Sequence, residues 1–154
     1  MEYRGDDSAG IALYRDGKIE TRKHVGEISN LEKIIGDPEF ESTIGIGHTR
    51  WATHGVPSDL NAHPHFNHYH SIVVVHNGII ENYLKLKKKL AGKGYEFLSE
   101  TDTEVIAHML DYYYKGDPRD AISKVMPRMG GSSGFGILFR DHPDGVFAVP
   151  KASP

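Results

Sequence analysis

The sequence predicts one α+β domain in which a largely antiparallel sheet is covered by helices. Segments with strand character and segments with helix character cluster along the chain instead of alternating strictly, which is typical of this class. Two pairs of strand-like runs are joined by short turn sequences, at residues 16–17 and 141–145, so each pair is expected to run antiparallel. The 154 residues suffice for one ordinary core, because a chain of this length buries roughly 70% of its unfolded surface.

A hairpin is the first predicted element, over residues 9–25. Two β-rich runs flank the Asp-Gly pair at residues 16–17, which supplies the positive φ angles of a tight turn. A short helix is expected next, because Ser29 and Glu32 have the spacing of a capping box. Gly36 then ends that helix.

Two β-branched runs, residues 42–50 and 71–78, are predicted to be buried strands. Both stop in polar residues and glycine, as strands do where they deliver side chains to a sheet edge. Their ends are therefore candidate site positions. The second run leads into residues 79–94, where apolar residues at helical spacing predict a helix that closes at Gly92 and Gly94.

The last third of the chain predicts two helices and a second hairpin. Thr101 and Glu104 form another candidate capping box in front of an apolar helical stripe. A further helix is expected to start at residues 117–118, because proline at a first helical position loses no hydrogen bond. Strands over residues 135–140 and 145–149 complete the domain, which shows no internal repeat or linker.

Composition excludes several classes of function. The net charge of −3 provides no positive field for nucleic acid or an anionic membrane, and the basic run at residues 85–89 is interpreted as the solvated face of a helix. No stretch approaches the roughly 20 apolar residues that span a bilayer, and no signal peptide is evident, so a cytoplasmic location is expected. There is no cysteine, which excludes disulfides and thiolate metal sites. No cofactor is expected.

Four histidines within eight positions, His63, His65, His68 and His70, raise the hypothesis of a metal site. The alternative is a turn-rich loop. Zinc sites usually combine such spacings with a helix or with cysteine and carboxylate ligands, and the His-Pro-His sequence imposes an extended backbone. We therefore expect the loop and no metal.

Arg50 lies at the end of a predicted strand, beside threonine, histidine and the only tryptophan. An arginine in that setting can bind the carboxylate of an amino-acid ligand, or it can form a structural ion pair. Asn77 and Gly78 follow another strand, where a side-chain amide and a backbone N–H can converge on an oxygen as in an oxyanion hole. Asn-Gly is equally an ordinary turn dipeptide. Asp102 can bind an amine or cap the helix that follows.

Four segments together resemble the glutaminase domain of the glucosamine-6-phosphate synthase family, the class II glutamine amidotransferases that act on fructose 6-phosphate. They are residues 2–10, 45–65, 73–83 and 99–108, in the family's order and spacing, and the resemblance extends to Pro154. Amidophosphoribosyltransferases share the domain type but lack the Thr-His-Gly after Trp-Ala and the Gly-Ile-Ile-Glu-Asn after His-Asn. The hexosamine enzymes are therefore the better match.

The resemblance implies an N-terminal-nucleophile hydrolase fold, with two antiparallel sheets sandwiched between helical layers. The chain starts after the family's opening Cys-Gly-Ile, so the family's first strand and first helix are expected to be missing. Residues 1–154 then form a partial type 2 glutamine amidotransferase domain, without the isomerase domains. Asp6 replaces the tyrosine that is usual in the family.

The resemblance also implies a glutamine site. Arg50 matches the residue that binds the glutamine α-carboxylate, and Asp102 matches the residue that holds the α-amine. Thr53 and His54 are expected to line the same pocket. The partners of the parent protein would be glutamine, fructose 6-phosphate and its own isomerase domains. The parent is also expected to be a homodimer, formed mainly by the part of the protein that is not in this chain.

The remaining family positions surround the reacting amide. Asn77 and Gly78 match the oxyanion hole, Arg4 matches an arginine near the nucleophile, and Trp51 matches the gate of an ammonia channel. In the family an N-terminal cysteine attacks the amide, and this chain has no cysteine. The chain is therefore predicted to be inactive alone. Alternatives are a non-catalytic glutamine-binding module, an amidophosphoribosyltransferase-type domain, or a histidine-rich metal protein.

Overall fold

Two antiparallel sheets face each other in a computed structural model that describes residues 7–36 and 42–151. Sheet A contains, in spatial order, β2 (Lys18–Val25), β1 (Ser8–Arg15) and β3 (Gly45–Arg50). Sheet B contains β4 (His65–Phe66), β5 (Ile72–Gly78), β6 (Ser133–Phe139) and β7 (Phe147–Lys151). The helices are α1 (Ile28–Ile35), α2 (Tyr83–Ala91), α3 (Glu104–Tyr113) and α4 (Pro118–Val125), with a 3₁₀ turn, η2, at Met126–Arg128.

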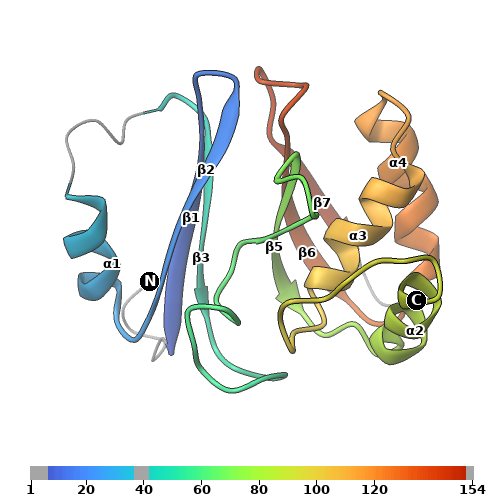
Figure 1. Cartoon of the computed structure of the whole chain (residues 1–154), viewed down its shortest axis with the longest axis horizontal. Coiled ribbons are helices and arrows are strands. Elements are labelled where there is room, and N and C mark those ends of the chain that lie inside the picture. Colours follow the sequence, from blue (N-terminus) through green and yellow to red (C-terminus); the bar gives the residue numbers. More distant parts are fainter. Residues whose placement is uncertain (1–6, 37–41, 152–154) are drawn as a thin grey trace.

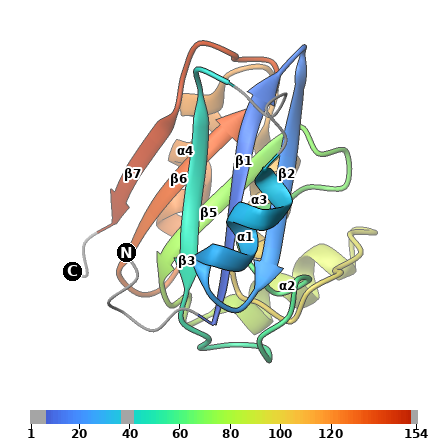
Figure 2. The same ribbon diagram turned by 90° about the vertical axis from the view of Figure 1, so that its left-hand side faces the viewer.

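The layers run helix, sheet, sheet, helix. Helix α1 covers the outer face of sheet A, and α2, α3 and α4 lie outside sheet B (Figure 1). Figure 2 shows sheet A from its outer side, with β1 between β2 and β3. The predicted α+β class, with two antiparallel sheets between helical layers, is confirmed.

Local chemistry explains some of the element boundaries. Asp16 and Gly17 take the predicted left-handed conformation, with φ of 48° and 75°, and join β1 to β2. The Asp117 carboxylate accepts from the backbone N–H of Arg119 and of Asp120, and so caps α4, whose first residue is Pro118.

Both predicted capping boxes are wrong. Helix α1 starts at Ile28 without a side-chain cap, so Ser29 lies inside its first turn. Helix α3 starts after Thr103, and the Thr101 hydroxyl instead lies 3.0 Å from His65 Nε2. The spacing rule failed there because a tertiary partner competes for the hydroxyl.

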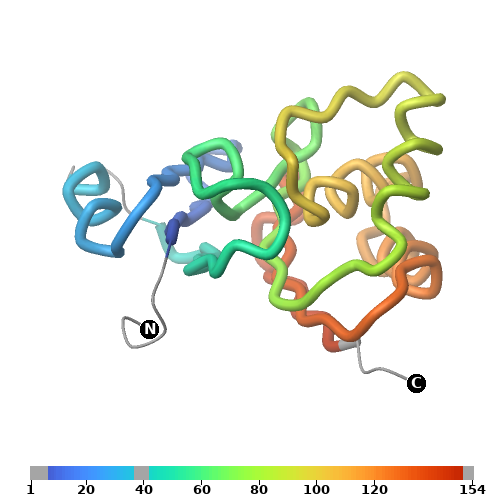
Figure 3. The backbone as a smooth tube through the Cα atoms, turned by 90° about the horizontal axis from the view of Figure 1, so that it is seen from below, coloured from blue at the N-terminus to red at the C-terminus, as the bar shows by residue number. Residues whose placement is uncertain are grey.

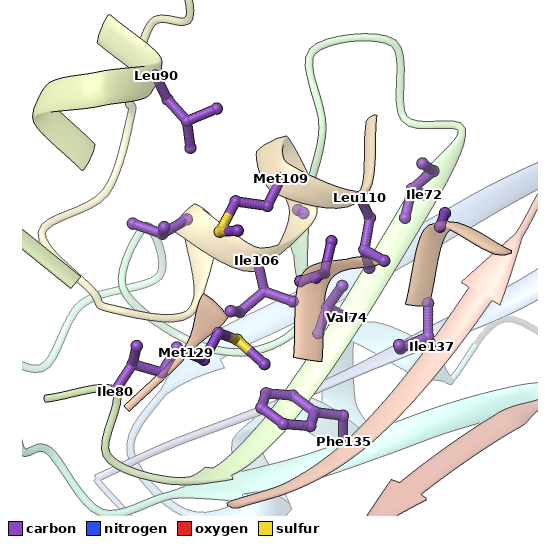
Figure 4. Packing of buried hydrophobic residues seen from close by; sticks show 14 of the residues in the cluster. Ile72, Val74, Ile80, Leu90, Ile106, Met109, Leu110, Met129, Phe135 and Ile137 are labelled. Carbon is purple, nitrogen blue, oxygen red and sulfur yellow. The ribbon is translucent and has the colours of Figure 1, made fainter. Parts of the chain in front are cut away.

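The main core lies between sheet B and the helices (Figure 4). Ile106 and Leu110 of α3 pack toward Val74 of β5, with Phe135 and Ile137 of β6 beside them. A second, smaller cluster fills the space between the two sheets, and its buried members are Ala12, Ile19, Val73 and Leu138. Alternate side chains of β5 thus pack into the two cores, as expected for a strand buried on both faces.

Strands β3 and β5 both end at the lower edge of the molecule in Figure 1, where α3 begins. This arrangement gathers three polar chain segments at one end of the two-sheet sandwich. None of the helices within residues 7–36 and 42–151 combines the length and apolar character needed to cross a membrane.

Candidate functional site

A pocket of about 740 Å³ opens where β3 and β5 end, at the end of the molecule that Figure 3 views from below. Its lining comes from β3 and the loop after it, from the connection before β4, from the end of β5, and from the segment just before α3. The lining residues are Gly47, His48, Thr49, Arg50, Trp51, Thr53, His63, His76, Asn77, Gly78, Ile79, Asp102 and Thr103. The pocket therefore brings together Arg50, Trp51, Thr53, Asn77, Gly78 and Asp102 of the residues predicted from sequence.

Arg50 is the buried cation of the pocket, with 4% of its surface exposed. Its Nη2 donates to the backbone carbonyls of His54 and Gly55, the latter at 3.0 Å, while Nη1 lies 4.0 Å from an Asp7 carboxylate oxygen. Burial lowers the pKa of Arg50, and the charges of Asp7 and Asp102 oppose that shift. The guanidinium stays charged, because its ordinary pKa lies far above neutrality.

Asp7 explains how the chain turns beneath Arg50. Its second carboxylate oxygen accepts from the backbone N–H of Ala52, and its own N–H donates to the Arg50 carbonyl at 3.0 Å. Asp7 thus orders the turn that follows β3. No local pattern in the sequence marks Asp7 as a site residue, because its partner lies more than forty positions away.

Asp102 is the buried anion of the pocket, with 4% exposure. One carboxylate oxygen accepts from the backbone N–H of Ile80 at 2.8 Å, and the other accepts from the Thr103 hydroxyl at 3.4 Å. The bond to Ile80 ties the segment that starts α3 to the chain just beyond β5. Asp102 makes no hydrogen bond that would cap α3 by its own side chain.

Asn77 and Gly78 do not form a turn. Both belong to β5 and pair with Gly134 and Ser133 of β6. Gly78 has a φ of 138°, and a Cβ there would lie 2.5 Å from the Ser132 carbonyl oxygen, so only glycine fits. The turn interpretation of this dipeptide is therefore wrong, and the amide of Asn77 sits exposed at the pocket.

The other predicted residues differ in their placement. Trp51, 71% exposed, and Thr53 lie at the pocket surface. His54 does not line the pocket. Its ring packs edge-on against Tyr83, with 4.7 Å between ring centres, and its backbone carbonyl accepts a hydrogen bond from Arg50. Arg4, with its neighbour Asp6, lies outside the described residues.

Two buried histidines, His63 and His76, line the pocket, and neither was predicted from the sequence to lie there. His63 stacks on His48 at 4.4 Å between ring centres, and His76 stacks on Phe135 at 4.7 Å. Burial lowers the pKa of His63 and of His76, and it lowers the pKa of His65 to about 3. These rings are therefore neutral at pH 7.

The histidine cluster of the sequence does not form a metal site. His63 and His65 are buried, whereas His68 and His70 are exposed. Within the part of the chain that the structure describes, no three histidine or carboxylate side chains are placed to hold a metal ion. The segment is instead a connection that delivers His63 and His65 to the interior.

The arrangement suits a small zwitterion. A guanidinium and a carboxylate on opposite segments of one pocket complement a ligand that carries a carboxylate and an ammonium group. An exposed amide at the end of β5 adds a neutral donor and acceptor. No described lining residue carries a thiol.

Comparison with known proteins identifies the class of this domain. The chain belongs to the glutamine amidotransferase domain family, whose profile matches residues 48–149.

Among individual proteins, the glutamine–fructose-6-phosphate aminotransferases (isomerizing) of Clostridium perfringens and Clostridium acetobutylicum are 54% and 55% identical to it. Each match covers the whole of this chain and 25% of the relative, so the chain spans a quarter of their length.

Solved structures show the same architecture. The glutamine phosphoribosylpyrophosphate amidotransferase from B. subtilis, complexed with ADP and GMP, superposes with a TM-score of 0.75. That match covers 90% of this chain and 30% of the other, at 28% identity. The two-sheet fold is thus shared with the phosphoribosylpyrophosphate amidotransferase. In sequence, the chain is more similar to the fructose-6-phosphate aminotransferases than to that enzyme.

Proposed function

We propose that this chain is the glutamine-binding part of a glutaminase domain that serves a glutamine–fructose-6-phosphate aminotransferase. Arg50 binds the glutamine α-carboxylate, Asp102 binds the α-amine, and Thr53 lies beside them. Asn77 and Gly78 face the side-chain amide, where they form the oxyanion hole. The observation that supports this proposal best is the placement of one buried cation and one buried anion, Arg50 and Asp102, in a single pocket.

The geometry of Arg50 supports a carboxylate ligand. Its Nη2 is occupied by two carbonyls, while Nη1 has no hydrogen bond within the described residues and only a long ion pair to Asp7. A ligand carboxylate would complete the guanidinium with charge-assisted bonds. A lysine could not do so and also hold both carbonyls in the same plane.

Hydrolysis needs a nucleophile that the 154 residues do not contain. In the proposed reaction a cysteine thiolate attacks the amide carbon, and the carbonyl oxygen becomes negative as the tetrahedral intermediate forms. The Asn77 amide and the Gly78 N–H would donate to that oxygen. Since the sequence has no cysteine, we expect this polypeptide to bind glutamine and release no ammonia from it.

The wider protein is part of the same proposal. Residues 1–154 form a partial type 2 glutamine amidotransferase domain, and the isomerase domains that use fructose 6-phosphate lie outside them. Trp51 gates the path of ammonia toward those domains. We also propose a cytoplasmic homodimer for the parent protein. The identity of 54% to a fructose-6-phosphate relative favours this assignment over an amidophosphoribosyltransferase.

Calorimetric titration of the chain with L-glutamine tests the binding claim. Arg50→Lys should weaken binding by about tenfold or more, because a charge-assisted hydrogen bond contributes about 1.5–3 kcal/mol. Arg119→Lys is the matched control, since Arg119 is exposed on α4 and does not line the pocket. Equal affinities for both variants would refute the assignment of Arg50.

A ligand without the α-amine tests Asp102. Glutaramate retains the carboxylate and the amide of glutamine, so wild-type protein should bind it more weakly than glutamine. In Asp102→Asn that difference should shrink, because the amine no longer meets a charge. A difference that persists unchanged would show that Asp102 does not contact the amine. Ammonia release by the purified chain above the level of a buffer blank would contradict the requirement for a cysteine.

A further inference from the structure

One buried hydroxyl lies where the segments that build the pocket meet. Thr103 Oγ1 is 3.0 Å from His76 Nδ1, 3.3 Å from His63 Nε2 and 3.4 Å from Asp102 Oδ1. The residue is fully buried and also lines the pocket. Its hydroxyl therefore contacts β5, the connection before β4, and the segment that starts α3.

The hydrogen bonds of this cluster indicate where its protons lie. His63 Nδ1 accepts from the backbone N–H of His76 at 3.3 Å, so the neutral ring carries its proton on Nε2 and donates it to Thr103. Thr103 gives its own proton to the Asp102 carboxylate. The hydroxyl then accepts from His76 Nδ1–H, which leaves His76 Nε2 to accept from the Ser133 hydroxyl at 3.0 Å.

This proton pattern satisfies every member of the cluster with both histidines neutral. A hydroxyl has one proton and two lone pairs, and Thr103 uses all three. Removing the hydroxyl would leave two buried imidazole N–H groups and one carboxylate oxygen with a lost partner, and buried polar groups without partners are costly.

We propose that Thr103 is a positioning residue of the pocket. Its hydroxyl sets the placement of Asp102 relative to the end of β5, because it binds Asp102 directly and holds His76, the residue before Asn77. It thereby sets the distance between the site for a ligand's amine and the site for its amide. This inference rests on the proposed function for its ligand, a free α-amino acid with a side-chain amide.

Thr101 provides a matched control from the same segment. Its hydroxyl is as buried as that of Thr103, and it makes a comparable bond to a histidine, His65 Nε2, at 3.0 Å. Thr101 and His65 do not line the pocket. A purely structural role would make Thr101 and Thr103 equivalent, whereas a positioning role separates them.

The test compares Thr103→Val, Thr103→Ser and Thr101→Val, each examined for its melting temperature and for its glutamine affinity by calorimetry. Valine keeps the shape of threonine without the hydroxyl, and serine keeps the hydroxyl. Thr103→Val should weaken glutamine binding by about tenfold, and Thr103→Ser should stay within about threefold of wild type. Thr101→Val should lower the melting temperature with affinity unchanged. Equal losses of affinity for the two valine variants would overturn the proposal.

If Thr103→Val does not fold, the positioning role of Thr103 can be tested on the wild-type protein. Nitrogen-15 spectra of the imidazole rings should show His63 protonated at Nε2 and His76 protonated at Nδ1. The opposite tautomer at either ring would overturn the proposal, because the single hydroxyl proton of Thr103 would then go to that ring and could not also go to Asp102.

Backbone amide spectra separate this inference from the proposed function. If wild-type protein binds no glutamine, the proposed function fails. The backbone amide signals of Asn77, Gly78 and Asp102 then test positioning: they should move in Thr103→Val relative to Thr103→Ser. Unmoved signals would overturn it.

Discussion

Replacing Gly10 by alanine should disturb the fold at the point where the connection to β4 crosses sheet A. A Cβ on Gly10 would lie 2.0 Å from the His63 carbonyl oxygen and 3.1 Å from that of Arg22. The His63 backbone would have to move by about 1 Å to make room. Strand β1 cannot move instead, because β2 and β3 pair with it on both sides.

Overpacking of this kind costs about 1–3 kcal/mol, and each kcal/mol lowers the melting temperature of a domain of this size by about 2–4 °C. Urea denaturation of Gly10→Ala should show the loss directly. Gly134→Ala is the matched control, because a Cβ in that strand position meets no atom within 4 Å. A Gly10 variant as stable as the Gly134 variant would show that the connection does not lie against β1 as described.

Three further predictions concern stability. Acid should destabilise the fold, because burial holds the pKa of His65 at about 3, whereas unfolded histidine titrates near 6.5. Below pH 6.5 the unfolded state binds a proton that the folded state does not, so the free energy of unfolding falls with pH. This residue alone should lower it by about 2 kcal/mol at pH 5, measured by urea denaturation at pH 5 and again above pH 6.5. No loss at pH 5 would contradict the burial of His65. Asn82→Ala should cost about 1–3 kcal/mol in the same assay, since its amide donates to the Arg128 carbonyl and accepts from the Gly130 N–H. Asp117→Ala should cost about 1 kcal/mol through loss of the α4 cap, with Asp117→Asn close to wild type; equal losses would remove the cap from the explanation.

Much of the fold was predictable because it depends on local patterns. The turn at Asp16-Gly17, the start of α4 at Pro118 and the apolar stripe of α3 follow from residues close in sequence, and the structure contains each of them. The failed capping boxes mark the limit of such rules. Ser29 and Thr101 have the right spacing, yet nothing in the sequence reveals that His65 takes the Thr101 hydroxyl.

Some residues of the candidate site could be predicted from the sequence, and others could not. Arg50, Asn77 and Asp102 were recognisable because each sits at the edge of a predicted element, and one pocket joins them. Asp7 and Thr103 were not, because their contacts join segments far apart in the chain.

The pocket is proposed to bind glutamine through Arg50, Asp102 and the end of β5. Titration of isotopically labelled protein with L-glutamine, followed through backbone amide signals, tests it most directly. Saturable shifts are expected, with the largest in residues 47–53, 76–79 and 102–103. Saturable shifts centred on another surface, or no shift at millimolar glutamine, would contradict it.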